Sequence, residues 1–448
     1  MKKEKRNDKI EEKRVKQGKS NEKKIITSHL SRIGKLIKSY AYKIRNRKSG
    51  KDFTRESKVG FVKYILMVLN FMKKSVQIEV NKFFRNVVEE GIGVKRQSFE
   101  DAREKILDSA FVEIYEVSVE DAIGLEDADY YKAGSITSRE GYRISVIDGT
   151  TPRLENSEEL RREYGESTPC EGQVFARVSL VYDVLNDFIS DADIQPFSIG
   201  ERKMAMNHIE KMIQKDTHEN LFVMDRGYWS PELAAKIHDS GNKFLMRIQK
   251  TTSKAVRNDA NNSGIFKVKY DGITYKFRFF KFILPSGEVE ILATNLSYAE
   301  ASDQTLAELY CLRWGIESKY RQLKCHLAIE AFTGKSKLIV RQDFFATVYL
   351  CNILSFACMA SDDIIVKNNI DKHLKNIHVT NRAVAISLLK DEFVKIIIDD
   401  SPRRRARKLN QLLLDISKFD SSVGRNRVGK RGIIAPKSKP HRKFKEPL

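Results

Sequence analysis

The chain has 448 residues, of which 41% are hydrophobic and 31% charged, and its formal net charge is +21. This length and apolar share suit two or three domains with a substantial core and exclude a wholly disordered chain. The charge is uneven, because residues 1–51 carry a net +14, residues 402–448 a net +12 and the residues between them −5. Basic ends on a mildly acidic body predict a polyanionic partner, most simply nucleic acid. Basic ends that only aid solubility are the alternative.

We expect neither a signal peptide nor a membrane span. The first 25 residues have no apolar core. The longest uncharged run, residues 344–360, has 17 residues, fewer than the roughly 20 that cross a bilayer, and predicts a buried helix instead. The five cysteines form no CxxC pair, which indicates free thiols in a reducing compartment. These observations predict a cytoplasmic protein that has no membrane partner.

The N-terminal third is expected to hold a tail and a helical domain. Residues 1–51 are rich in lysine, with little apolar periodicity, and predict a disordered basic tail. Residues 52–135 have apolar positions at helical spacing, a break at Gly91–Val94, and a second helix that starts at Ser98 with a capping-box pattern. Helix, turn and helix is the outline of a DNA-binding motif, although ordinary helical packing gives the same outline. The residues expected to contact DNA here are Lys95, Arg96 and Arg103.

Residues 136–241 are predicted to alternate strands and helices, as in an α/β layer. One apolar run ends in Asp148, before a turn-like GTTP segment, and another ends in Asp225. Helical patterns follow at residues 201–214 and 230–240, the second with a serine cap and a proline at its first position. An aspartate after a strand usually starts a turn or caps a helix, so each is unremarkable alone.

A β-rich insertion is expected next, at residues 242–299. Alternating apolar and basic residues flank Asp271–Gly272, a dipeptide that predicts a tight hairpin. Residues 300–370 are expected to complete the α/β core. Residues 371–448 predict a C-terminal helical region and a second basic tail. The SPRRRARK segment at 401–408 is a candidate DNA contact, either with the DNA of a second protomer or with target DNA.

The most informative segment is a predicted helix at residues 303–327. Counted from Tyr310, the positions 3, 7 and 14 residues later are Arg313, Glu317 and Lys324. At about 100° per residue these four residues share an arc of about 60° around the helix. Leucine and isoleucine residues form a separate stripe that can pack on a core. A solvated face is the ordinary explanation of charged residues. Here cations outnumber Glu317, because Arg321 adds to the excess, and an anionic partner would balance them.

Asp148, Asp225 and Glu317 are the candidate catalytic and metal-binding residues. Two strand-end acids and one helical acid would converge at an edge of the sheet, where mutual repulsion calls for a divalent cation. Oxygen ligands favour Mg²⁺ or Mn²⁺. Two such ions, about 3.5 to 4 Å apart, activate an attacking oxygen and stabilise a leaving one in phosphoryl transfer.

These motifs resemble the DDE insertion-sequence transposases of the IS-four type, whose signature is Tyr, two residues, Arg, three, Glu, six and Lys. Tyr310, Arg313, Glu317 and Lys324 match every spacing. DGTT, DRGYWSPE, FLMRI, LATNL, FTGKS and RQDFFAT are similar to further family motifs, so the resemblance runs from about Phe53 to Ser401.

The resemblance implies an RNase H-like catalytic domain interrupted by a β insertion, with Asp148, Asp225 and Glu317 as the triad for two metal ions. It implies that Tyr310, Arg313 and Lys324 hold terminal DNA phosphates. It also implies cut-and-paste transposition through a DNA hairpin, with terminal inverted repeats and target DNA as partners and a homodimer in the synaptic complex. Further expected DNA contacts are Arg226, Tyr228 and Arg321.

One departure concerns base flipping. Some relatives brace a flipped base with a tryptophan of the insertion, whereas Trp229 and Trp314 lie outside residues 242–299. Two other functions stay open: a non-catalytic, domesticated DNA-binding protein, and a structure-specific nuclease on the same fold.

Overall fold

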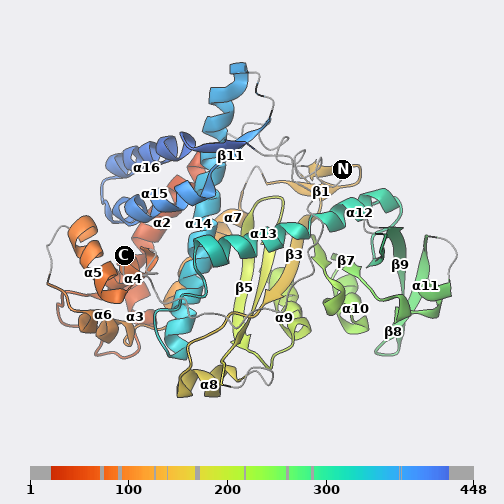
Figure 1. Ribbon diagram of the computed structural model, residues 1–448, viewed down its shortest axis with the longest axis horizontal. Coiled ribbons are helices and arrows are strands. Elements are labelled where there is room, and N and C mark those ends of the chain that lie inside the picture. Colours follow the sequence, from red (N-terminus) through yellow and green to blue (C-terminus); the bar gives the residue numbers. More distant parts are fainter. Residues whose placement is uncertain are drawn as a thin grey trace. The chain divides into compact units, whose positions relative to one another are not determined.

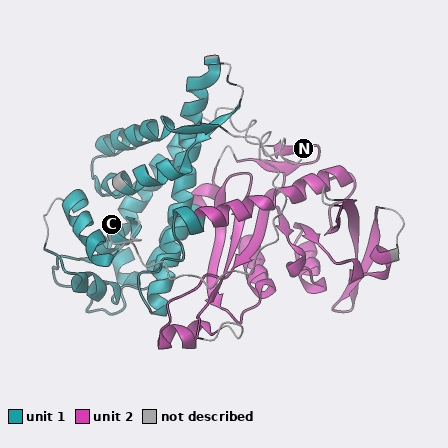
Figure 2. Cartoon of the chain, viewed as in Figure 1, with its two compact units in different colours: residues 1–118, 323–448 teal, residues 119–322 magenta. Residues whose placement is uncertain are grey.

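The computed structural model describes residues 22–70, 75–88, 93–125, 128–138, 140–166, 172–215, 218–258, 262–283, 287–372, 374 and 376–422. The chain divides into two compact units (Figure 2). Unit 1 contains residues 1–118 and 323–448, and unit 2 contains residues 119–322. The chain therefore starts unit 1, forms all of unit 2, and then returns to finish unit 1. This division differs from the six consecutive segments expected from the sequence.

Unit 2 is a mixed α/β structure around one eight-stranded sheet, with the order β5-β4-β3-β6-β7-β10-β9-β8. β3, β4 and β5 are antiparallel neighbours, and β6 and β7 run parallel to β3. β10, β9 and β8 continue the sheet in antiparallel fashion. The strands are β3 (Arg143–Thr150), β4 (Ala176–Asp183), β5 (Phe188–Pro196), β6 (Asn220–Met224), β7 (Lys243–Arg247), β8 (Ser263–Tyr270), β9 (Ile273–Ile283) and β10 (Val289–Thr294); β1 (Tyr130–Lys132) and β2 (Ser135–Ser138) form a separate pair.

The β-rich segment predicted at residues 242–299 contains β7, β8, β9 and β10, which extend the main sheet. β7 and β10 pair directly, with Ala293 opposite Met246. The predicted hairpin is confirmed: β8 and β9 are joined by Asp271 and Gly272, both with positive φ (48° and 74°), as a two-residue primed turn requires. The GTTP prediction was wrong in part, because Gly149 and Thr150 continue β3 and pair with β4.

Helices cover both faces of the sheet of unit 2. α9 (Glu201–Lys215) and α10 (Pro231–Asp239) bury Ala205, Ile209 and Leu233 in one core cluster with strand residues such as Ile147 and Met224. α13 (Trp314–Arg321) packs against β3. In Figure 1, α12 (Asp303–Cys311) and α13 cross in front of the strands. The remaining helices of the unit are α8 (Glu158–Tyr164) and α11 (Lys254–Asn258).

The helix predicted at 303–327 is broken into three pieces. α12 ends at Cys311, and the chain then passes through Leu312 and Arg313 with short i→i−3 hydrogen bonds, such as Gly315 N to Leu312 O at 2.9 Å. After α13, residues Gln322–His326 form a wider π-helical turn. Because such a turn rotates less per residue than an α-helix, the assumed 100° period does not extend to Lys324.

Unit 1 is built around the long helix α14 (Lys337–Asn369), which packs against α2, α4, α15 and α16. This helix is long and apolar enough to cross a membrane, with a window of mean hydropathy 1.7, yet 94% of that window is buried inside the protein. The other elements are α2 (Glu22–Lys38), α3 (Tyr40–Asn46), α4 (Phe61–Leu69), α5 (Val76–Phe83), α6 (Arg96–Arg103), α15 (Arg382–Ile398), α16 (Pro402–Ser417), β11 (His378–Thr380) and β12 (Asp420–Ser422), and α7 (Ser109–Ile123) crosses the unit boundary.

The prediction of a disordered tail over residues 1–51 was wrong for residues 22–51. α2 buries Ile26, Leu30, Ile33 and Ile37 completely or almost so. Their spacing of four, three and four residues is a helical stripe, which the abundant lysines obscure. Residues 1–21 and 423–448, and therefore most of the predicted C-terminal tail, lie outside the described residues.

The predicted DNA-binding motif is only partly present. α6 begins at Arg96, so Ser98 lies inside the helix and does not cap it. The predicted break at Gly91–Val94 falls partly outside the described residues. Lys95 and Arg96 are exposed, and Arg96 forms a 2.6 Å ion pair with Glu100.

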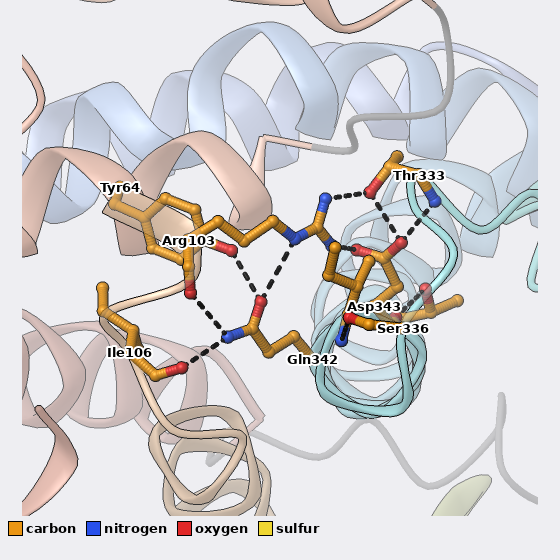
Figure 3. Close-up of polar contacts among 9 residues, drawn as sticks. Tyr64, Arg103, Ile106, Thr333, Ser336, Gln342 and Asp343 are labelled. Atoms are coloured by element: carbon orange, nitrogen blue, oxygen red, sulfur yellow. Dashed lines mark hydrogen bonds and ion pairs between the residues drawn. The ribbon is translucent and has the colours of Figure 1, made fainter. Parts of the chain in front are cut away.

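Arg103, expected to contact DNA, is instead buried inside unit 1 (Figure 3). Its guanidinium forms a 2.5 Å ion pair with Asp343 and donates to Gln342 and Thr333. Asp343 also accepts from the backbone N–H of Thr333 at 2.6 Å, and the Gln342 amide donates to the carbonyl of Ile106 at 2.7 Å. The FTGKS and RQDFFAT segments thus fix the end of α6 to α14, because a buried guanidinium needs both charge and hydrogen-bond partners.

Candidate active site

Two of the three candidate acids lie on neighbouring strands of unit 2, Asp148 within β3 and Asp225 directly after β6. β3 and β6 are parallel, and Ile147 is the partner of Met224, so Asp148 and Asp225 are the next residues along the two strands. Ile147 and Met224 belong to the core on the α9 and α10 side. Because side chains alternate along a strand, Asp148 and Asp225 start on the opposite side, where α13 packs on β3.

Arg313 links the third acid to this pair. It immediately precedes α13 and carries a guanidinium that is 3.6 Å from the Glu317 carboxylate one helical turn later. Burial alone would lower the pKa of Arg313, but Tyr310, Asp225, Glu317 and Asp148 raise it above its ordinary value. The guanidinium also lies over the ring of Trp314, 4.6 Å from its centroid. One buried cation therefore lies beside Glu317 and is influenced electrostatically by Asp225 and Asp148.

Tyr310 holds Asp225 from α12. Its hydroxyl donates a 3.0 Å hydrogen bond to Asp225 Oδ1, and the side chain is almost fully buried. Arg247, at the end of β7, approaches the same oxygen at 3.8 Å and Glu290 at 3.4 Å. The Tyr310 to Asp225 contact ties the helical motif to the strand that precedes it by 85 residues.

The two aspartates have pKa values shifted in opposite directions. Burial raises the pKa of Asp148 to about 6; Glu201 and Asp225 add to the increase, and the Gly149 N–H and Arg313 oppose it. For Asp225, burial is outweighed by the Arg226 N–H, Arg313, Tyr310 and Arg247, which hold its pKa below the ordinary value. Such divergent carboxyl groups are typical of a reactive site.

The donor set fits a hard divalent cation, since Asp148, Asp225 and Glu317 offer only oxygen ligands. Asp225 is partly exposed, and Glu317 has 45% of its side chain exposed, so oxygen atoms of both are accessible. Within the described residues, no three acidic, histidine or cysteine side chains lie close enough to hold one ion together. Arg313 lies 3.6 Å from Glu317 and Arg247 lies 3.8 Å from Asp225, so both arginines place positive charge beside these carboxylates.

The other predicted site residues are distributed as follows. Arg226 and Arg321 are exposed in unit 2. Tyr228 is buried, and among the described residues its hydroxyl has no hydrogen-bond partner. The prediction of a DNA contact was therefore wrong, because the ring packs in the core beside α9 and α10. Lys324 belongs to unit 1, where its ammonium is 3.5 Å from Glu330.

Sequence reasoning missed Arg247, Glu201 and Arg177. Glu201 begins α9, and its carboxylate packs against Gly149, where an added Cβ would lie 3.1 Å from Oε1. Arg177 pairs with Glu201 at 2.9 Å. Arg247 stands in the FLMRI motif, which offered a signal for it; nothing in the sequence near Glu201 marks its proximity to Asp148.

Residues 139–353 match a family model described as the transposase DDE domain. This match supports a DDE transposase, with DNA transposition as its activity. Among solved structures, a piggyBac transposase synaptic complex with hairpin DNA is similar with 9% identity and a TM-score of 0.44, covering 87% of this chain and 82% of that chain. No curated protein sequence matches this chain.

Proposed function

We propose that the protein is a metal-dependent DNA transposase of the IS-four type that moves its element by cutting and pasting. The observation that carries the proposal is the arrangement of the three acids in unit 2: Asp148 and Asp225 follow paired residues of the parallel strands β3 and β6, and Glu317 lies on α13, which packs against β3. All three lie in the segment that matches the transposase DDE domain.

The proposed chemistry is phosphodiester cleavage followed by strand transfer. Two Mg²⁺ or Mn²⁺ ions would supply an activated oxygen nucleophile and stabilise the leaving oxygen. Asp148, Asp225 and Glu317 would hold those ions through their carboxylate oxygens. Tyr310 keeps Asp225 oriented and ionised through its hydrogen bond. Arg313 stabilises the negative charge that develops on the phosphoryl oxygens in the transition state.

The finer features of the proposal follow the resemblance. An RNase H-like domain is supported by three antiparallel strands followed by two strands parallel to the first. We propose that DNA phosphates are contacted by the exposed Arg226 and Arg321 of unit 2. In unit 1 we propose the same role for Lys95, Arg96 and Lys324. We further propose a hairpin intermediate, terminal inverted repeats and target DNA as partners, and a homodimer that joins two element ends.

The test uses purified full-length protein, the DNA flanking its gene as candidate element ends, and Mg²⁺. Replacing each acid by its amide (D148N, D225N, E317Q) should reduce cleavage and strand transfer by at least a thousandfold and leave DNA binding intact. E210Q changes an exposed acid on α9 and should retain full activity.

Three outcomes decide between the candidate functions. Cleavage that survives all three amide variants would remove these residues from the chemistry. Binding without any cleavage by the unaltered protein would favour a non-catalytic DNA-binding protein. Cleavage of branched DNA without joined products would favour a structure-specific nuclease.

A further inference from the structure

The two strongly basic ends of the chain meet as a pair of helices in unit 1. Lys23 Nζ donates to Asn410 Oδ1 at 2.6 Å, Arg405 Nη2 donates to Ser31 Oγ at 3.2 Å, and Lys38 Nζ contacts Asp400 at 2.5 Å. Successively later residues of α2 contact successively earlier residues of α16 and of the segment that precedes it. The two helices therefore run antiparallel, side by side.

Three arginines, Arg403, Arg404 and Arg405, follow Pro402 in the first turn of α16, and that turn has no acidic residue. The amino end of a helix carries partial positive charge, so cations there oppose folding instead of supporting it. A local arrangement that works against stability is expected where function requires it.

Part of this charge is neutralised inside unit 1. Asp399 is 3.1 Å from Arg404 and 2.9 Å from Lys408, so one carboxylate faces two cations. Arg405 turns toward Ser31. Arg403 and Arg407 are exposed, one turn apart, on the side of α16 opposite the buried Leu409, Leu412 and Ile416. Within the part of the chain that the structure describes, neither arginine has an ion-pair partner.

α2 contributes a matching stripe. Lys24, Lys35 and Lys38 lie within about 40° of Ser31 around the helix at 100° per residue, and Ser31 is the residue that contacts α16. Lys35 is exposed, and no acid among the described residues pairs with it. Given the antiparallel pairing, Lys35 stands level with the start of α16, where Arg403 lies.

We propose that α2 and α16 form one surface that binds the phosphate backbone of duplex DNA, with Lys35, Arg403 and Arg407 as its main contacts. Arginines one helical turn apart are about 6 Å apart along the axis, so each can reach a separate phosphate. Leu414 is the one large apolar side chain of α16 that is well exposed, so the surface offers little to insert into a lipid bilayer. The choice of DNA as the polyanion rests on the proposed function, but the binding needs none of the catalytic acids.

The experiment measures the anisotropy of a labelled duplex of arbitrary sequence, titrated with full-length protein in EDTA so that no cleavage occurs. The triple variant K35Q/R403Q/R407Q should bind at least tenfold more weakly at low salt. Its plot of log K against log salt should be shallower by about 2 to 3, because each phosphate contact contributes about 0.9 to that slope. The variant leaves the Lys23–Asn410 and Ser31–Arg405 contacts intact.

A matched control removes three exposed lysines from the β8–β9 hairpin of unit 2, in K267Q/K269Q/K276Q. It has the same charge as the test variant and should keep an affinity and slope close to those of the unaltered protein. Equal losses in the two variants would show a general charge effect and overturn the proposal. An unchanged affinity and slope in the test variant would overturn it as well. So would a test variant that loses binding to vesicles of anionic phospholipid but keeps its affinity for the duplex. The catalytic assignment is tested separately, because it concerns the cleavage activity of D148N and not the binding of the duplex in EDTA.

Discussion

Lys319 and Asp187 form a 2.7 Å ion pair that is buried inside unit 2, with 2% and 7% of their side chains exposed. Lys319 lies on α13, two residues after Glu317, and Asp187 lies in the turn between β4 and β5. The Tyr182 hydroxyl donates to the same carboxylate at 2.7 Å. Tyr320 is the residue after Lys319, and its hydroxyl donates to the backbone carbonyl of Asp148 at 2.7 Å. These contacts place the helix that carries Glu317 on the strands that carry Asp148.

Breaking this ion pair should destabilise unit 2. K319M is expected to lower the free energy of unfolding by about 3 kcal/mol, because it leaves the Asp187 carboxylate buried without its counter-charge. The double variant K319M/D187N should lose less than the sum of the single losses. Both tryptophans of the chain, Trp229 and Trp314, lie in unit 2, so urea unfolding followed by tryptophan fluorescence reports on this unit. A loss below about 0.5 kcal/mol in K319M would contradict the prediction.

Gly315 should not tolerate a side chain. An added Cβ would lie 2.7 Å from Val184 Cγ2 and 3.4 Å from the Tyr182 ring, so G315A must displace α13 or the β4–β5 turn. We expect a loss of about 2 kcal/mol in stability, as in other overpacked cores. V184A removes the nearest obstacle, so G315A/V184A should be more stable than the sum of the two single changes predicts. Strict additivity in thermal unfolding would argue against this contact.

Arg313 should compete with divalent cations for the acidic cluster. R313M removes the guanidinium that neutralises Asp148, Asp225 and Glu317, so Mn²⁺ should bind about tenfold more tightly while DNA cleavage falls. R313K keeps the charge and should keep the metal affinity closer to that of the unaltered protein. Mn²⁺ binding followed by electron paramagnetic resonance measures the effect. Weaker Mn²⁺ binding in R313M would be the opposite of what the structure predicts.

Glu300 should make unit 2 sensitive to acid. Burial would raise its pKa, but hydrogen bonds from Ser297 and Tyr142 and the ammonium of Lys243 lower that pKa to about 2. The unfolded chain binds a proton near the ordinary value of 4.5, so this contribution to stability is complete above that pH and is lost as pH falls toward 2. Between pH 5 and pH 3 the unaltered protein should therefore lose more stability than E300Q does. Parallel acid profiles for the two proteins in the tryptophan assay would refute the assignment.

The sequence predicted those parts of the fold that depend on local patterns. The apolar runs before Asp148 and Asp225 are strands, and the Asp271–Gly272 dipeptide is a hairpin turn, because strand periodicity and turn chemistry are encoded within a few residues. The sequence predicts a strand before each of the two acids; that these strands are adjacent and parallel emerges only from the structure.

Long-range partners were beyond local patterns. Arg103 resembles a surface cation until Asp343, 240 residues away, is placed beside it. The hydrogen bond of Tyr310 to Asp225 and the approach of Arg313 to Glu317 come from two helices separated by an interruption, which an ideal helical wheel omits. Composition alone predicts a tail at α2, because its lysines outweigh its isoleucine stripe, although only the stripe determines which side packs.

The passage of the chain from unit 1 into unit 2 and back sets an order for its synthesis on the ribosome. α4, α6 and the buried Arg103 emerge early, yet their partner helix α14 follows more than 200 residues later. During that interval unit 2 can complete its sheet. The first part of unit 1 meanwhile has an uncovered apolar face, and Arg103 lacks its partner Asp343. Nascent chains stalled before α14 should therefore be the ones that chaperones retain and proteases attack.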